Sequence, residues 1–138
     1  MTTKTNIREN TAILSEALTS LSASNGSGSV LSPETISEFD AAKKLSTIEN
    51  PWFSETNIED ALSGLAYMLR PEALQQWLEK YKLGHRYTGK TVGMVLAGNI
   101  PLVGFHDIFT TCLAGHKALV KASSQDKRLL PLVFKAFN

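Results

Sequence analysis

The chain has 138 residues, 43% of them hydrophobic, and a formal net charge of +1 at pH 7. This length and composition are those of one ordinary folded domain and exclude a chain that is disordered throughout. The single cysteine excludes an internal disulfide, and no Cys/His pair has metal-ligand spacing, so no metal is expected. No apolar run is long enough for a membrane span, and the first residues lack the apolar core of a secretory signal, which predicts a cytoplasmic protein.

The two halves of the chain carry opposite charge. Residues 1–79 hold five Lys/Arg and eleven Asp/Glu, a net charge of −6, whereas residues 80–138 hold nine and two, a net charge of +7. A basic half is typical of a surface that binds a polyanionic small molecule, such as a phosphorylated dinucleotide or coenzyme A. An acidic helical surface packed beside a basic one explains the pattern equally well. Nucleic acid is not expected as a partner, because the cations are scattered and no aromatic stacking platform accompanies them.

The first half of the chain is predicted to be helical. Apolar spacing and helix start and stop signals predict four helices, over residues 6–21, 33–47, 58–69 and 71–83. The clearest start is Ser32-Pro33-Glu34, because it places a capping hydroxyl, a proline and an acid in the order that a helix amino terminus favours. A Ser/Gly-rich linker is predicted over residues 22–29, and residues 50–53 are predicted to end the second helix.

The most informative segment runs from Thr91 to Gln125. It predicts a short buried strand over Thr91–Ala97, a helix over Leu102–Leu113 that ends at a left-handed Gly115, and a second strand over Lys117–Lys121. A further helix is expected from about Asp126. A strand, a crossover helix and a strand form a parallel unit, so both strands end at the same edge, where ligands of open parallel sheets bind. The predicted fold class is therefore α/β, with a helical amino-terminal half followed by a βαβ unit.

These residues resemble a known family. The succession Asn99-Ile100-Pro101, then Gly115 to Lys121, then Ala122 to Gln125 is similar to the start of the cofactor domain of the aldehyde dehydrogenase superfamily. The segments AGNIPLVGFHD and SSQDK, with NPWFS and QQWLEKY upstream, resemble one branch, the acyl-CoA reductases related to the reductase subunit of the bacterial luminescence fatty-acid reductase. The resemblance covers about residues 50–131. It implies a helical region over residues 1–83 and the truncated start of a Rossmann-like cofactor domain over residues 84–138.

The resemblance also implies an activity. It indicates the amino-terminal part of an NADPH-dependent fatty-acyl-CoA reductase, in which the acyl group moves from coenzyme A to a cysteine thiol and hydride transfer then releases the aldehyde. In that superfamily the thiol lies far downstream, so this chain alone is expected to be inactive. Two other interpretations remain: another coenzyme-A-acylating aldehyde dehydrogenase, and a non-catalytic helical interaction module. The unfinished sheet edge favours self-association, so a homo-oligomer is also expected.

Two residues of the resemblance carry the expected chemistry. Asn99 matches the superfamily asparagine that stabilises the oxyanion of the tetrahedral adduct, although an asparagine before Pro101 also suits a simple turn. Lys121 matches the lysine that contacts the adenosine ribose of the nicotinamide cofactor.

The remaining cofactor contacts are expected in the two loops. The backbone should face the cofactor at Leu96, Ala97 and Gly98. After Lys121, the chain has Ser123 and Ser124, with serine at position 124 where the superfamily often has glutamate. A glutamate there would repel a 2′-phosphate and a serine does not, which favours NADPH over NADH.

Several other residues invite a functional reading that the pattern does not favour. Residues 84–91 spell the phosphate-loop motif G-x-x-x-x-G-K-[ST], but a helix precedes them and a strand follows, which is the reverse of the required order. Cys112 is expected to be a small buried core residue and His106 a partly buried structural histidine, while His116 lies at a helix end. Trp52 and Trp77 are expected to anchor helix packing rather than to line an acyl pocket.

Overall fold

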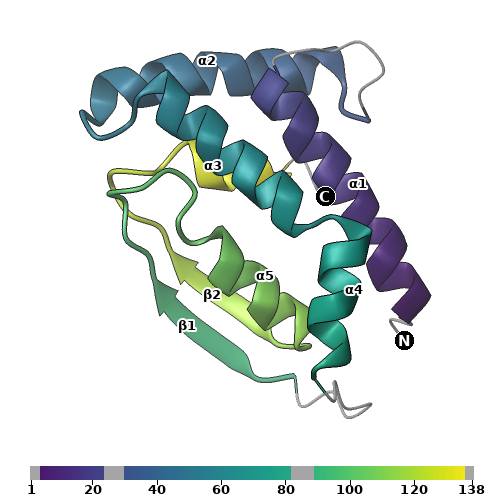
Figure 1. The fold of residues 1–138 in the computed structure, drawn as a ribbon. Helices are drawn as coiled ribbons and strands as arrows, with labels where there is room; N and C mark the ends of the chain where they lie inside the picture. The colour runs from purple at the N-terminus through teal and green to yellow at the C-terminus, as the bar shows by residue number, and fades with distance from the viewer. Residues whose placement is uncertain (1–3, 24–29, 82–88, 136–138) are drawn as a thin grey trace.

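The computed structural model describes residues 4–23, 30–81 and 89–135, which form helices and a two-stranded sheet (Figure 1). The elements follow in the order α1 (Lys4–Ala23), α2 (Pro33–Glu49), α3 (Glu55–Met68), α4 (Pro71–Glu79), β1 (Thr91–Val95), α5 (Phe105–Leu113), β2 (Lys117–Lys121) and α6 (Leu129–Lys135). The predicted order of helices and strands is therefore confirmed within the described residues. None of the described helices is both long and apolar enough to cross a membrane.

The sheet is parallel, as the strand–helix–strand pattern predicts. Thr91 pairs with Lys117 at one end and Val95 with Lys121 at the other. The ladder continues one residue past β1, since the backbone N–H of Leu96 donates to the carbonyl of Lys121 at 3.1 Å. Both strands consequently end at the same edge, which we call the carboxyl edge of the sheet.

The two faces of the sheet differ in burial. One face packs toward α5 and holds the half-buried side chains of Val92, Met94, Ala118 and Val120 (Figure 1). The opposite face is open: the side chain of Val95 is 80% exposed and that of Leu119 is 67% exposed. The prediction of a wholly buried strand is therefore wrong, because within the described residues only one face has a layer packed on it.

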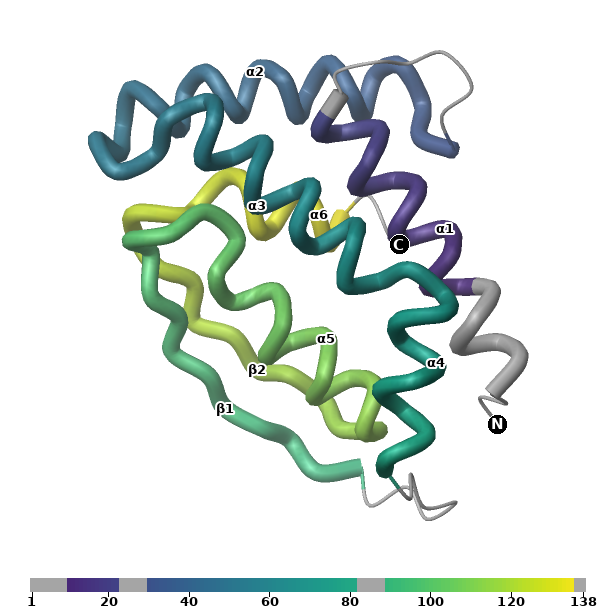
Figure 2. Tube along the Cα trace, viewed as in Figure 1, coloured from purple at the N-terminus to yellow at the C-terminus, as the bar shows by residue number. Residues whose placement is uncertain are grey.

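The helices form the second layer of the molecule. Helix α1 packs along α3 and contacts α4, whereas α2 crosses the ends of α1 and α3, and α6 lies behind α3 and contacts α2 (Figure 2). Helices α5 and α6 meet where Phe105 stacks on Phe134, with ring centroids 5.4 Å apart. The buried cluster is continuous from α1 to α6 and includes Leu18, Leu21, Phe39, Phe53, Ile58, Leu62, Leu69, Leu102, Phe105, Leu129 and Val133.

Serine hydroxyls cap two of the helices. The backbone N–H of Thr35 donates to Ser32 Oγ at 3.2 Å, which confirms the predicted start of α2. Ser54 caps α3 in the same way, accepting from the N–H of Asn57 at 3.0 Å. Each hydroxyl satisfies a backbone donor that has no partner inside its helix, which fixes the start of the helix.

Several element boundaries differ from the prediction. Strand β1 ends at Val95 rather than Ala97, and α5 begins at Phe105 rather than Leu102. Leu102 has a φ of +59°, a left-handed conformation that is incompatible with a right-handed helix, so the chain turns there before α5 starts. Helix α6 begins at Leu129, after the residues around Asp126 that were expected to open it. The predicted linker, apart from its first two residues, and the predicted end of α4 lie outside the described residues.

We expect the core between the layers to dominate stability. Leu62 of α3 is fully buried in it, so Leu62→Ala should lower the free energy of unfolding by about 2–5 kcal/mol, since it removes apolar contacts and leaves a cavity. Leu45→Ala on α2 is the matched control, because Leu45 is 43% exposed and the same truncation there should cost far less. Urea unfolding of the two variants measures both effects, and equal losses would contradict this placement of the core.

Candidate functional site

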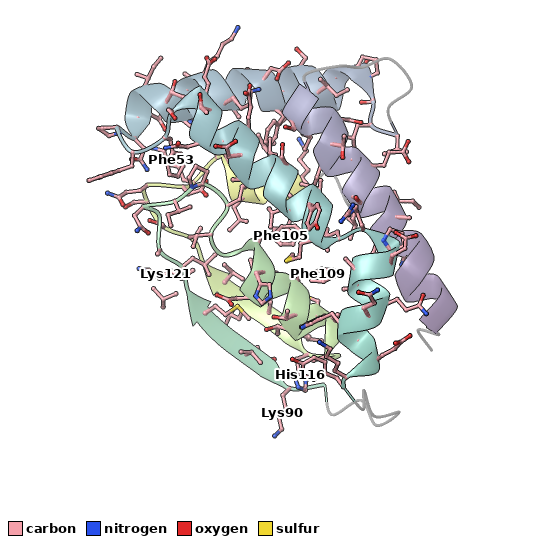
Figure 3. All side chains as sticks on the ribbon, viewed as in Figure 1. Phe53, Lys90, Phe105, Phe109, His116 and Lys121 are labelled. Carbon is pink, nitrogen blue, oxygen red and sulfur yellow. The ribbon has the colours of Figure 1, made fainter. Side chains whose placement is uncertain are left out.

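The candidate site lies at the carboxyl edge of the sheet, where two loops leave the strands. One loop runs from Leu96 after β1, and the other runs from Ala122 after β2. Lys121 lies at this edge, whereas Lys90 and His116 lie at the opposite end of the strands (Figure 3). The topology therefore brings the residues after both strands to one side of the molecule, as predicted.

The two loops approach each other closely at Gly98, which is buried. A Cβ atom added at Gly98 would lie 2.7 Å from Ser123 Cβ and 2.8 Å from Gln125 Cβ. These atoms are attached directly to the neighbouring backbone and have no freedom to swing away. Glycine is thus required at position 98 by the contact between the loops, whatever its backbone angles.

A buried asparagine from the helical half holds these loops together. The side-chain N–H₂ of Asn50 donates to the carbonyl of Gly98 at 3.0 Å and to the carbonyl of Gln125 at 3.1 Å. Its Oδ1 accepts from the backbone N–H of Trp52 at 3.0 Å. Asn50 is only 2% exposed, so these bonds replace the water that its amide would otherwise bind. From the sequence, Asn50 is expected only to end the second helix, because nothing local to the segment indicates contacts 48 and 75 residues away.

Asp126 holds the other side of the first loop. Its Oδ2 accepts from the backbone N–H of Leu102 at 3.0 Å and so supports the left-handed turn there. Burial raises the pKa of the Asp126 carboxyl, while the N–H groups of Leu102, Leu130 and Leu129 act in the opposite direction. Oδ1 nevertheless has no hydrogen bond of ordinary geometry among the described residues.

An ion pair joins the end of α2 to the segment after the second loop. Arg128 Nε donates to Glu49 Oε2 at 2.8 Å, and a second guanidinium nitrogen bonds the other carboxylate oxygen. Lys127 Nζ lies 3.6 Å from the same carboxylate. The hydrogen bonds from Arg128 lower the pKa of Glu49 to about 2. Glu49 and its neighbour Asn50 therefore fasten α2 to the carboxyl edge by a charged and a neutral contact.

The predicted polar side chains at this edge differ in their surroundings. Asn99 is exposed, and no hydrogen bond within the described residues involves its side chain. Lys121 and Ser124 are exposed as well, and Lys121 has no ion pair in the described part of the chain. Ser123 is half-buried and its Oγ accepts from the N–H of Gln125 at 3.2 Å. The edge thus offers an unengaged amide, an ammonium group and a hydroxyl, which are groups that bind anionic oxygens.

The backbone groups predicted to face a cofactor are partly engaged already. The N–H of Leu96 belongs to the sheet ladder and the carbonyl of Gly98 accepts from Asn50. The Leu96 side chain is half-buried and packs so closely on Gly104 that an added Cβ there would meet it. Ala97 is exposed. The contribution of this stretch to the surface is consequently limited to its remaining backbone groups and the Ala97 side chain.

Three predictions for side chains outside this edge are wrong. Cys112 is exposed rather than buried, because it lies in the last turn of α5 and the buried cluster ends one turn earlier, at Ile108. Trp52 is 69% exposed and cannot anchor helix packing, although its backbone is fixed by Asn50 and by Asn57, whose Nδ2 donates to its carbonyl at 3.2 Å. His106 is exposed as well.

His116, Trp77 and Lys90 of the phosphate-loop motif, which were not expected to form a site, lie far from the carboxyl edge. His116 is half-buried next to β2, and its Nδ1 has no hydrogen bond among the described residues. Trp77 is half-buried and its ring lies 5.2 Å from that of Tyr81. Most of the phosphate-loop motif, residues 84–88, lies outside the described residues, but α4 precedes the motif and β1 follows it. That is the reversed order, with no helix amino terminus directly after Lys90 to bind a phosphate.

Comparison with known proteins identifies a family. A family model described as acyl-CoA reductase (LuxC) matches residues 16–138. The match includes α2 to α6, both strands and both loops of the candidate site. No curated protein matched the chain, and neither did any solved structure.

We expect the Glu49–Arg128 contact to make stability depend on pH in acid. The folded pKa of Glu49, about 2, lies below its ordinary value of 4.5, so its contribution is complete above pH 4.5 and is lost as the pH falls toward 2. Glu49→Gln should therefore be less stable than the wild type at neutral pH, and the gap should close near pH 2. Urea unfolding across this range measures the gap.

Glu16→Gln is the control for this experiment. Glu16 is an exposed glutamate of α1 with no ion pair among the described residues, so its replacement should leave a small and constant difference. A gap for Glu49→Gln that stays constant down to pH 2 would show that the contact does not persist in solution.

Proposed function

Because the chain belongs to the acyl-CoA reductase (LuxC) family, we propose that it forms part of the active site of an enzyme that reduces a fatty acyl-CoA to an aldehyde with NADPH. The family makes acyl-CoA the substrate class and favours an oxidoreductase over a non-catalytic helical module. The observation that carries the proposal is the unengaged amide of Asn99, which lies at the carboxyl edge together with Lys121.

Asn99 would act as the oxyanion donor. When a thiolate attacks the thioester carbonyl, negative charge develops on the carbonyl oxygen and the coenzyme A sulfur leaves as the adduct collapses. A fixed amide donor aimed at that oxygen stabilises it by about 3–4 kcal/mol. Asn99 suits this role because its side chain is exposed and makes no hydrogen bond to any described residue. A turn-forming asparagine would typically bond its own backbone instead.

The thiol itself would come from residues beyond these 138. Cys112 is the one cysteine of the sequence. It lies near the end of α5, immediately before β2 starts at Lys117, whereas Asn99 follows the end of β1. In a βαβ unit these two positions are at opposite ends of the strands. Asn99 and Cys112 therefore cannot act on one carbonyl group.

The cofactor would lie over the two loops, which the absence of a side chain at Gly98 allows to pack closely against each other. NADPH supplies the hydride that converts the acyl group to the aldehyde. Lys121 and Ser124 are both exposed and would hold the ribose and its 2′-phosphate, since one carries a positive charge and the other adds no negative charge. Among residues 121–126 the only carboxylate is that of Asp126, which is buried against Leu102. The donor set thus fits a phosphorylated ribose.

We further propose that residues 84–138 begin a larger Rossmann-like domain and that residues 1–83 form its helical partner. Val95 and Leu119 support this, because large apolar side chains on the face of a parallel strand are normally covered by another layer, although Lys117 and Lys121 share this exposed face. Location in the cytoplasm and assembly into a homo-oligomer remain predictions of the sequence.

Substitution of Asn99 tests the activity. In the complete enzyme, Asn99→Ala should lower kcat for an acyl-CoA by about 10²–10³-fold with folding intact, since it removes one preorganised donor. Release of free coenzyme A and oxidation of NADPH measure turnover. Cys112→Ala, at the other end of the βαβ unit, is the control and should retain activity. Full activity of Asn99→Ala would remove the basis of this proposal, as would a folded but inactive Cys112→Ala.

Cofactor preference is tested at the second loop. Ser124→Glu should raise KM for NADPH far more than KM for NADH, because the added carboxylate repels the 2′-phosphate. Lys121→Ala should erase most of a preference that we expect to be about ten- to a hundred-fold. Lys117→Ala, an exposed lysine at the other end of β2, should leave the ratio of the two kcat/KM values unchanged. A wild-type preference for NADH would contradict the assignment.

A further inference from the structure

The amide of Asn50 uses every hydrogen-bonding group on contacts at the carboxyl edge and on its own turn. A side-chain amide has two N–H donors, and here one binds the carbonyl of Gly98 and the other that of Gln125. Its oxygen is occupied by the N–H of Trp52. The amide is therefore locked in one orientation, and the two loops are locked relative to it.

These contacts bracket the proposed oxyanion donor. Gly98, the residue before Asn99, is held by Asn50, and Leu102, three residues after it, is held by Asp126. Gln125, the second partner of Asn50, directly precedes Asp126, so the contacts of Asn50 and of Asp126 are linked through adjacent residues of the second loop. No hydrogen bond from the described residues fixes the Asn99 side chain. Its position therefore depends on the backbone between Gly98 and Leu102.

We propose that Asn50 is a positioning residue that sets the placement of Asn99 for catalysis. The inference rests on the proposed function of Asn99. A catalytic donor must be held within about 0.5 Å of its productive position, and a displacement of about 1 Å lowers rates by about 10²-fold. Asn50 supplies that precision from α2, which lies outside the βαβ unit and is packed against the core.

Asn50→Asp tests the role with little change in size. The aspartate loses both N–H donors and places a carboxylate oxygen against the two carbonyl groups, so the loops should move apart. In the complete enzyme, kcat should fall by about ten- to a hundred-fold, while KM for the acyl-CoA should change by less than about three-fold, because Asn50 does not touch the substrate. Asn50→Ser, an uncharged variant that keeps one donor, should fall between the wild type and Asn50→Asp.

Asn57→Ala is the matched control. Asn57 also donates its side-chain amide to a carbonyl of the same turn, that of Trp52, but among the described residues it has no hydrogen bond to either loop. Its replacement should leave kcat within about three-fold of the wild type. Thermal unfolding of each variant identifies any that fail to fold, and Asn50→Ser keeps the test informative if Asn50→Asp is one of them.

A double-mutant cycle separates positioning from a general structural effect. If Asn50 acts through Asn99, then adding Asn50→Asp to Asn99→Ala should lower kcat by less than about three-fold further, because no donor is left to position. Two results overturn the positioning role while leaving the proposed function intact: effects that multiply, or single Asn50 variants with normal kcat in an enzyme that Asn99→Ala disables. An active Asn99→Ala enzyme would instead overturn the proposed function and this inference with it.

Discussion

The contact on which the rest of the site depends is the one between a side-chain amide and two carbonyl groups. Asn50 lies at the end of α2, yet its donors reach both loops of the sheet. Because the amide is buried, losing a partner would leave polar groups without water, which makes the contact costly to break. Hydrogen bonds as well as the apolar core therefore connect the helical half to the sheet, and the two loops are held against the helices.

The opposite charges of the two halves have more than one cause. Part of the basic excess pairs with the acidic helix α2, since Lys127 and Arg128 contact Glu49 and Lys135 contacts Glu38. These surface pairs are of the kind that an acidic layer beside a basic one predicts. Lys90, Lys117 and Lys121 have no such pair among the described residues. The strands thus carry an unpaired basic surface, and Lys121 brings part of it to the carboxyl edge.

The sequence predicted the elements well because their signals are local. Ser32 before Pro33 marks the start of α2, and Gly115, with a φ of +87°, marks the end of α5. The parallel orientation of the two strands follows from the strand–helix–strand order. In each case neighbours within a few residues decide the conformation, so periodicity and capping rules suffice.

What the sequence did not reveal is non-local. The roles of Asn50 and Asp126 depend on segments that meet only after the two layers pack, so no window around either residue predicts them. The predictions of side-chain burial were wrong for a related reason. Cys112 lies on the apolar side of α5, but whether that side is covered at the last turn depends on where the neighbouring elements stop. Trp52 is held by its backbone, while its indole lies in solvent.

The features that cost free energy gather around Asn99. Leu102 adopts a left-handed conformation, Asp126 is a buried carboxyl group whose pKa is raised, and Gly98 allows no side chain. Each is unfavourable or restrictive by itself, and natural chains retain such features mainly where the surrounding structure enforces a functional geometry. The large apolar core supplies the stability that tolerates them. Their concentration on the residues flanking one exposed amide indicates that the geometry of this loop, rather than its stability, is what the fold maintains.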